Sequence, residues 1–268
     1  LMLRTRFTDA YGLAAPIASA GMAMIAMPAL AAAVSNAGGF GTLGGAMAPP
    51  DALRELVRAT RGLTRRPFGV DLITEFVAPA HIDVLPEVGV IRRLQRAGIR
   101  VWMQVGSVEE ARNAAGAEVD LVVAQGSEGG GHNRSEAATF TLLPAVCDAV
   151  APLPVLAAGG IADGRGLAAA LALGADGAWC GSRFLASEEA HAHAEYKARV
   201  LAANIGDTVV TTLFGPEWPE QPMRVIRNRV VTEWAGRERE ASLAAGRFGA
   251  IGTTLMGGER IPLPKFSA

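Results

Sequence analysis

One stretch of the sequence decides the fold class: PVLAAGGIADGRGLAAALALGADGAWCGS, residues Pro154–Ser182. It begins with the apolar run Pro154–Ala158 and passes through two glycines into a helical pattern that Asp163 caps. Gly174 ends this helix, and a second apolar run follows at Gly177–Gly181. Two apolar runs joined by a helix form a βαβ unit, which places both strands parallel in one sheet.

The alternation of apolar runs and helical patterns recurs along the chain, and repeated βα units of this kind predict a (β/α)8 TIM barrel. Helices are predicted at Pro28–Ala37, at Asp51–Arg61, from the capping box Ser107–Glu110 to Gly116, at Gly164–Leu173, and from Ser187 onward. Strands are predicted at Pro16–Ala20, Gly39–Leu43, Phe68–Ile73, Ile99–Val105, Val119–Gln125, Pro154–Ala158 and Gly177–Gly181.

The fourth βα unit departs from this pattern. Between Ile73 and Ile99 the chain offers only a weak run, Ile82–Leu85, before Glu87–Ala97 becomes helical. A barrel that lacks a strand would expose unpaired edges. We therefore expect either that residues are missing from the chain near Leu85–Pro86 or that the barrel is distorted and open.

The length of 268 residues fits one large α/β domain, in which residues 1–186 form the barrel. Residues 187–268 exceed the needs of a barrel, so they should form a helical and irregular extension packed on its mouth or outside. The two cysteines, Cys147 and Cys180, form no disulfide framework, and no signal peptide is evident, so we expect a reduced, cytoplasmic protein.

Charge and composition exclude several kinds of partner. The net charge of −1, without a basic stripe, argues against nucleic acid. The apolar stretches are broken by Gly, Pro and Ser, which argues against a membrane span. Spacings typical of a metal site or of a hydrolase triad are absent from the sequence. We expect a small-molecule substrate, and a homodimer is left open.

Two glycine-rich loops follow the last two predicted strands, Ala158–Ile161 and Cys180–Arg183. Phosphate groups commonly bind at these two positions of a (β/α)8 barrel, where glycine lets backbone N–H groups approach an anion. The loops therefore predict a phosphate-bearing ligand. Tight turns at the strand ends are the alternative interpretation.

The stretch AQGSEGGGHN, Ala124–Asn133, begins at the end of the predicted strand Val119–Gln125 and places an exposed His132 among four glycines. A histidine on a glycine-rich loop at a barrel mouth is poorly placed to fill the core, and an imidazole ordinarily titrates near neutral pH. We expect a functional role for His132 and surface positions for His81, His191 and His193.

Several of these segments, in this order, resemble the nitronate monooxygenase (2-nitropropane dioxygenase) family, whose flavin-site motif is usually read as AQG-x-EAGGH. The matching segments are Pro16–Met22, Val34–Gly44, Pro67–Leu72, Ala124–His132, Ala157–Gly177 and Gly181–Glu189. Together they cover most of the chain between Pro16 and Glu189.

The resemblance implies an FMN site across the strand ends. Its phosphate would lie on Gly159, Gly160, Gly181 and Ser182, and Gln125 and Gly130 would contact the flavin. The backbone of Gly21, Met22 and Ala23 would pass close to the isoalloxazine ring. Asp71 stands where the family usually has Asn, and an ionised carboxylate there could only accept hydrogen bonds and would disfavour the anionic reduced flavin.

The implied activity is oxidation of alkyl nitronates or nitroalkanes by O2, with His132 as the acid/base or substrate-orienting residue. A flavin-dependent enoyl-acyl carrier protein reductase using NADH or NADPH shares the barrel and a similar loop. Two alternatives from other classes are a catalytically silent flavin-binding barrel and a flavin-free barrel isomerase.

Overall fold

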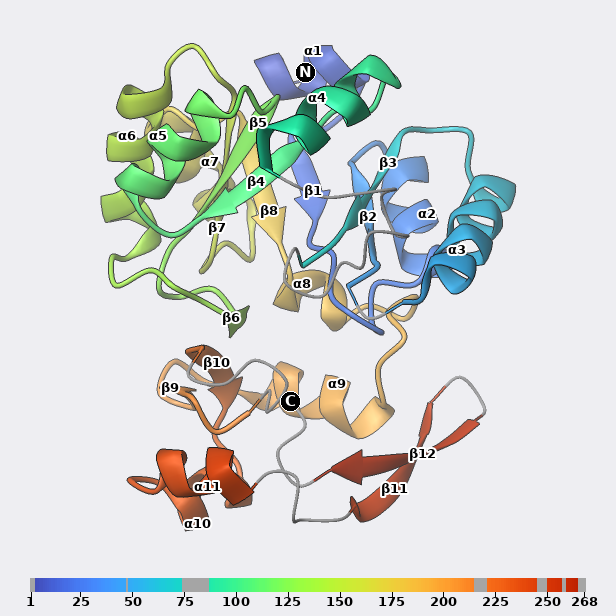
Figure 1. Ribbon diagram of the computed structural model, residues 1–268, viewed down its shortest axis with the longest axis vertical. Coiled ribbons are helices and arrows are strands. Elements are labelled where there is room, and N and C mark those ends of the chain that lie inside the picture. Colours follow the sequence, from blue (N-terminus) through green and yellow to red (C-terminus); the bar gives the residue numbers. More distant parts are fainter. Residues whose placement is uncertain are drawn as a thin grey trace.

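The computed structural model describes residues 3–46, 48–73, 87–214, 221–244, 250–256 and 259–264. Its first part alternates strands and helices (Figure 1). The elements of this part are α1 (Arg6–Tyr11), β1 (Ile17–Ser19), α2 (Pro28–Asn36), β2 (Gly41–Gly44), α3 (Pro50–Leu63), β3 (Phe68–Asp71), α4 (Glu87–Arg96), β4 (Trp102–Val105), α5 (Val108–Gly116), β5 (Leu121–Gln125), β6 (Gly131–His132), α6 (Thr139–Val150), β7 (Val155–Ala158), α7 (Gly164–Ala172), β8 (Gly177–Cys180) and α8 (Ser182–Leu185).

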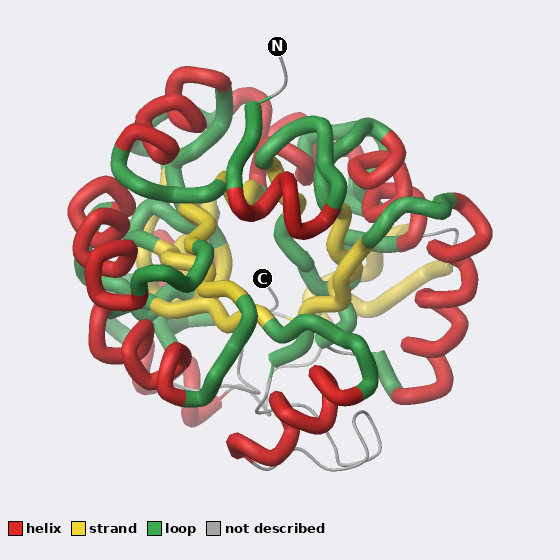
Figure 2. Tube along the Cα trace, turned by 90° about the horizontal axis from the view of Figure 1, so that it is seen from above, coloured by secondary structure: helices red, strands yellow, loops and turns green. Residues whose placement is uncertain are grey.

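The strands run parallel and confirm an α/β fold. One sheet has the order β1-β8-β7-β5-β4, a second pairs β2 with β3, and a parallel bridge between Ala18 and Phe40 joins β1 to β2. Seen from above, the strands lie around a central axis with helices outside them (Figure 2). All seven strands predicted from the sequence are present, each within two or three residues of its expected bounds.

The two strands at the ends of this series, β3 and β4, are not paired with each other in the described residues. Their side chains are correspondingly more exposed than those of β2 and β7, which are buried throughout. Val70 on β3 is 37% exposed and Met103 on β4 is 36% exposed. The weak run Ile82–Leu85 and the Leu85–Pro86 junction lie outside the described residues, so the truncated fourth unit stays a prediction.

Helix ends follow the predicted caps with two corrections. The Ser107 hydroxyl accepts a hydrogen bond from the Glu110 backbone N–H. The Glu110 carboxylate accepts from the Gly106 N–H and not from the Ser107 N–H, as a capping box would require. Ser187 does not start a helix. The next helix, α9 (Ala194–Ala202), begins after His193, because the preceding segment is held in a turn by the hydrogen bond from His191 N to Ile25 O.

The remaining elements lie beyond the carboxyl ends of the parallel strands, below them in Figure 1. Antiparallel pairing of β10 with β6 joins this part to the Ala124–Asn133 segment, and β9 pairs with the other edge of β10. Its elements after α9 are β9 (Thr208–Thr211), β10 (Met223–Ile226), α10 (Arg229–Trp234), α11 (Glu238–Ala244), β11 (Ala250–Met256) and β12 (Glu259–Pro264).

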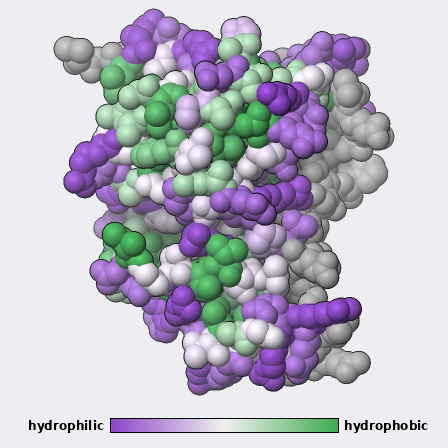
Figure 3. Space-filling view, turned by 90° about the vertical axis from the view of Figure 1, so that its left-hand side faces the viewer, coloured by the Kyte–Doolittle hydropathy of each residue, from purple (hydrophilic) through white to green (hydrophobic). Residues whose placement is uncertain are grey.

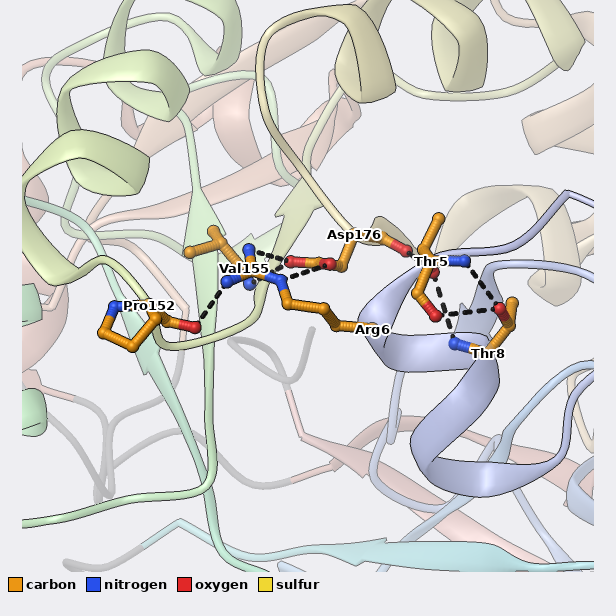
Figure 4. Close-up of polar contacts among 6 residues, drawn as sticks. All are labelled: Thr5, Arg6, Thr8, Pro152, Val155 and Asp176. Carbon is orange, nitrogen blue, oxygen red and sulfur yellow. Dashed lines mark hydrogen bonds and ion pairs between the residues drawn. The ribbon is translucent and has the colours of Figure 1, made fainter.

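Helix α1 covers the opposite end of the strands, where an ion pair fixes it (Figure 4). Both carboxylate oxygens of the buried Asp176 accept from Arg6, at 2.8 and 2.7 Å, and Oδ2 also accepts from the Val155 backbone N–H. The Thr5 hydroxyl donates to the Asp176 carbonyl at 2.7 Å, and Arg6 also donates to the Pro152 carbonyl. Beside this ion pair, the rings of Phe7, Tyr11, Phe40, Trp102 and Trp179 pack together.

On the side shown in Figure 3, apolar residues gather in the middle of the upper part of the molecule and polar residues border them. Within the described residues, no helix is both long and apolar enough to cross a membrane. Both cysteines are free thiols.

Candidate functional site

A cavity of ≈ 3360 Å³ lies at the carboxyl ends of the parallel strands and continues between β3 and β4. This volume exceeds the several hundred Å³ of a typical ligand pocket. All the site residues predicted from the sequence line it: Gly21, Met22, Ala23, Asp71, Gln125, Gly130, His132, Gly159, Gly160, Gly181 and Ser182.

Asp71, at the end of β3, packs directly against the loop that follows β1. A Cβ placed on Gly21 would lie 2.1 Å from the Asp71 Cβ and 2.8 Å from its Oδ2, so this close approach requires glycine at position 21. Burial raises the pKa of Asp71 to about 7, against the lowering effect of the Leu72 backbone N–H. Near neutral pH a large fraction of this carboxyl group is therefore protonated and can donate a hydrogen bond, as the amide of Asn does.

The Ala124–Asn133 segment is held by hydrogen bonds on several sides. The Asn133 side-chain amide donates to the carbonyls of Gly126 and Gly129, at 2.8 and 3.2 Å. The Glu128 carboxylate accepts from the backbone N–H and the hydroxyl of Thr139, at the start of α6. Glu128 thus acts as a structural acceptor that ties the segment to a helix.

The Gln125 side chain is oriented from the neighbouring strand. Gln104, on β4, donates from its amide to the Gln125 Oε1 at 2.9 Å. A Cβ on Gly129 would lie 2.8 Å from the Gln125 Nε2, so the backbone of the segment packs on the same amide. Gln125 is therefore fixed between β4 and its own loop.

His132 is half-buried, which corrects the expectation of an exposed side chain. His132 lies in the short strand β6 and pairs with Met223 of β10, because the C-terminal part of the chain supplies a strand beside it. Arg224, the next residue on β10, donates to the Ser127 carbonyl at 2.8 Å and to the Thr208 hydroxyl at 3.0 Å. The C-terminal part thus fixes the position of His132.

Packing and backbone conformation require glycine at some positions around the cavity and not at others. A Cβ on Gly159, whose φ is +103°, would lie 2.8 Å from Gly129 N, so packing and backbone conformation both require glycine. A Cβ on Gly181 would meet nothing closer than 3.8 Å, and one on Gly130 would lie 3.6 Å from the Ser182 hydroxyl. Packing does not require glycine at 130 or 181, and both face the same cavity.

A phosphate group fits this arrangement. A side chain at Gly130 would fill open space beside the Ser182 hydroxyl, and one at Gly181 would fill open space beside Ala20 and Met22. Gly160, whose φ is +71°, lines the same cavity. These residues come from the ends of β5, β7 and β8, so three adjacent strands converge on one small region.

Three contributors to the site were missed from the sequence. None of the three, Asn133, Arg224 and Gln104, belongs to a recognisable motif. Arg224 and Gln104 bond to residues distant along the chain, and Asn133 bonds to backbone carbonyls of its own loop. The position of Asn133, directly after the glycine run and the histidine, was the one available signal. His191 and His193 also line the cavity; His193 is exposed, as expected, whereas His191 is half-buried.

Comparison with known proteins identifies the family of this chain. The nitronate monooxygenase family model matches residues 4–85 and 77–247. These two matched segments meet at residues 77–85, the position of the predicted truncation.

A Mycobacterium tuberculosis protein named (3aS,4S,5R,7aS)-5-hydroxy-7a-methyl-1-oxo-octahydro-1H-indene-4-carboxyl-CoA dehydrogenase is 37% identical over 261 residues, covering 91% of this chain and 72% of that protein. Among solved structures, FabK from Thermotoga maritima superposes with a TM-score of 0.81 at 37% identity, covering 92% of this chain and 84% of the other. The nitroalkane oxidase from Streptomyces ansochromogenes gives 0.77 at 31% identity, covering 89% and 85%.

Proposed function

Because the chain belongs to the nitronate monooxygenase family, a family of flavin oxidoreductases, we propose that it is an FMN-dependent enzyme that oxidises alkyl nitronates and nitroalkanes with O2. The observation that carries the proposal is the convergence of the Ala124–Asn133 segment, the two glycine loops and the β1 loop on one cavity. The fold we propose is the (β/α)8 barrel, with its fourth unit truncated.

In this proposal the phosphate of FMN lies on Gly159, Gly160, Gly181 and Ser182. The open space at Gly181 supports this placement, because no packing contact requires glycine there. Gln125 and Gly130 contact the flavin, and the backbone of Gly21, Met22 and Ala23 lines its ring. FMN would supply the electron transfer, while the protein orients it and shields it from water.

His132 is proposed to handle the substrate proton. Its strand pairing with Met223 and the clamp of Arg224 on Ser127 support a fixed position, which proton transfer needs. Asp71 in its protonated form is proposed to donate a hydrogen bond where the family usually has Asn. A cytoplasmic location and the absence of nucleic-acid and membrane partners stay expectations from the sequence, and a homodimer is left open.

A second candidate is oxidoreduction of a thioester with a nicotinamide nucleotide as the partner, NADH or NADPH for reduction and NAD+ or NADP+ for dehydrogenation. The name of the M. tuberculosis relative, a CoA-ester dehydrogenase, favours it. The size of the cavity and its lining by Arg183, Arg199 and Arg224 also suit a larger, phosphate-bearing substrate.

One experiment separates these functions. Purified protein with its flavin is assayed for O2 uptake with propyl-2-nitronate and for NADH or NADPH oxidation with crotonyl-CoA. Nitronate-dependent O2 uptake supports the proposal, and thioester-dependent NAD(P)H oxidation selects the second candidate. A protein without a visible flavin spectrum after reconstitution would overturn both.

A further inference from the structure

The β1 loop, residues Gly21–Met27, is pressed closely onto the neighbouring strand. A Cβ on Gly44, the last residue of β2, would lie 2.0 Å from the Met22 carbonyl oxygen. Gly44 N donates to the Ala26 carbonyl at 2.9 Å, and Ala26 N donates to the Met22 carbonyl at 2.8 Å. One side of the loop is therefore fixed to β2 through backbone contacts.

At the tip of this loop, Met24 adopts a left-handed conformation with φ of +60°. For a residue with a long side chain this conformation is unfavourable and persists only where surrounding contacts hold it. Met24 is 49% exposed and lines the cavity, so packing of its own side chain does not hold the turn.

Within the loop, Ile25 N donates to the Met22 carbonyl at 3.1 Å, and the contacts that reach the tip from another segment come from His191. Its ring Nδ1 lies 3.0 Å from the Met24 carbonyl oxygen, and its backbone N–H donates to the Ile25 carbonyl at 2.9 Å. Because a carbonyl oxygen only accepts, Nδ1 carries the hydrogen. The preceding Ala190 is buried against Ala26 and anchors this segment to the loop.

We propose that His191 is a positioning residue of the flavin site: its Nδ1–H holds the Met24 carbonyl and keeps the β1 loop in the left-handed turn. The backbone of Gly21–Ala23, which lies in this loop, is thereby held in the shape that receives the flavin ring. The identity of that ligand rests on the function proposed above, but the coupling of His191 to Met24 does not.

The test combines side-chain rescue with a double-mutant cycle. His191→Asn keeps a nitrogen donor bonded to Cγ, where Nδ1 is, whereas His191→Gln moves it one bond further. His191→Ala and His191→Gln should weaken FMN binding roughly three- to tenfold, the loss of one hydrogen bond. His191→Asn should stay within about twofold of the wild type by the same measure. Flavin fluorescence titration gives the dissociation constants.

Met24→Gly supplies the second arm, because glycine adopts positive φ without penalty. His191→Ala is then made in the Met24→Gly protein and in the wild type, and two constants are measured, the urea-unfolding equilibrium constant and the FMN dissociation constant. In the Met24→Gly protein each constant should change by less than half the factor seen in the wild type. Asn36→Ala is the matched control, since the Asn36 side-chain amide donates to the Leu63 carbonyl at 3.1 Å and does not line the cavity, and it should leave FMN binding unchanged.

Equal losses in the two backgrounds, or rescue by Gln and not by Asn, would overturn the assignment. If the wild type binds no FMN, the proposed function fails, while the unfolding cycle still decides whether His191 and Met24 are coupled.

Discussion

The carboxyl group of Asp71 lies against the backbone of Gly21, so close that a Cβ on the glycine would be 2.8 Å from Oδ2. Burial of the carboxyl group, to which this contact contributes, raises its pKa to about 7. A residue that differs from the Asn usual in the family is therefore protonated over much of the acidic and neutral range.

Asp71→Asn should change the pH dependence of stability. The pKa of Asp71 is raised from 3.8 to about 7 on folding. The protonation of Asp71 therefore contributes to the free energy of unfolding fully below about pH 4, and this contribution is lost as the pH rises through 7. The stability of the variant relative to the wild type should increase between pH 4 and 8, by up to about 1.4 kcal/mol for each pKa unit of the shift. Urea unfolding across this range measures it. The exposed Asp51→Asn should show no such trend, and a flat difference for Asp71→Asn would refute the assignment.

Two glycine substitutions should have opposite effects. Gly181→Ala should leave the melting temperature nearly unchanged but weaken FMN binding at least about tenfold, because the added methyl group enters the proposed phosphate space. Gly126→Ala should instead prevent stable folding, since its Cβ would lie 2.2 Å from Thr139 N. Thermal denaturation and flavin titration on both variants separate the two. Unchanged FMN affinity in Gly181→Ala would place the phosphate elsewhere.

The flavin released on denaturation should be FMN. The two glycine loops offer donors for one terminal phosphate, and the sequence contains no second nucleotide-binding segment for the adenylate of FAD. Chromatography of the heat-released cofactor, against FMN and FAD standards, distinguishes them. Recovery of FAD would require a different reading of the glycine loops.

His132→Ala should affect nitroalkanes more than nitronates. A neutral nitroalkane must lose an α-proton before it can donate electrons, whereas a nitronate already carries the anion. The loss of kcat/KM should be on the order of 10²-fold or more with nitroethane and distinctly smaller with ethylnitronate. Equal losses would indicate that His132 orients the substrate or flavin, and unchanged activity would remove it from the mechanism.

Arg6→Ala should destabilise the protein without affecting the flavin site. It leaves the buried Asp176 carboxylate without its bidentate partner, which should cost about 1–3 kcal/mol in the free energy of unfolding. Arg4→Ala, which removes an exposed ion pair with Asp9, should cost less than about 1 kcal/mol. Urea unfolding and FMN titration test both. A change in FMN affinity in Arg6→Ala would show that the two ends of the strands are coupled.

The strands and the helices between them were predictable because each is specified locally. Runs such as Pro154–Ala158 are apolar enough to be buried on both faces, and Asp163 caps its helix through bonds to residues two and three positions away. That the residues proposed for the site would line one cavity was also predictable, because the carboxyl ends of parallel strands meet at one edge of the sheet.

What only the tertiary structure decided are contacts between distant segments. The segment after Ser187 is a turn and not a helix, because His191 bonds to the loop after β1. His132 is half-buried, because β10 pairs beside it. The raised pKa of Asp71 depends on its burial, in which the β1 loop fifty positions earlier takes part. Local pattern fixes which elements form, whereas burial and hydrogen bonding of a given side chain depend on neighbours that the chain brings together only on folding.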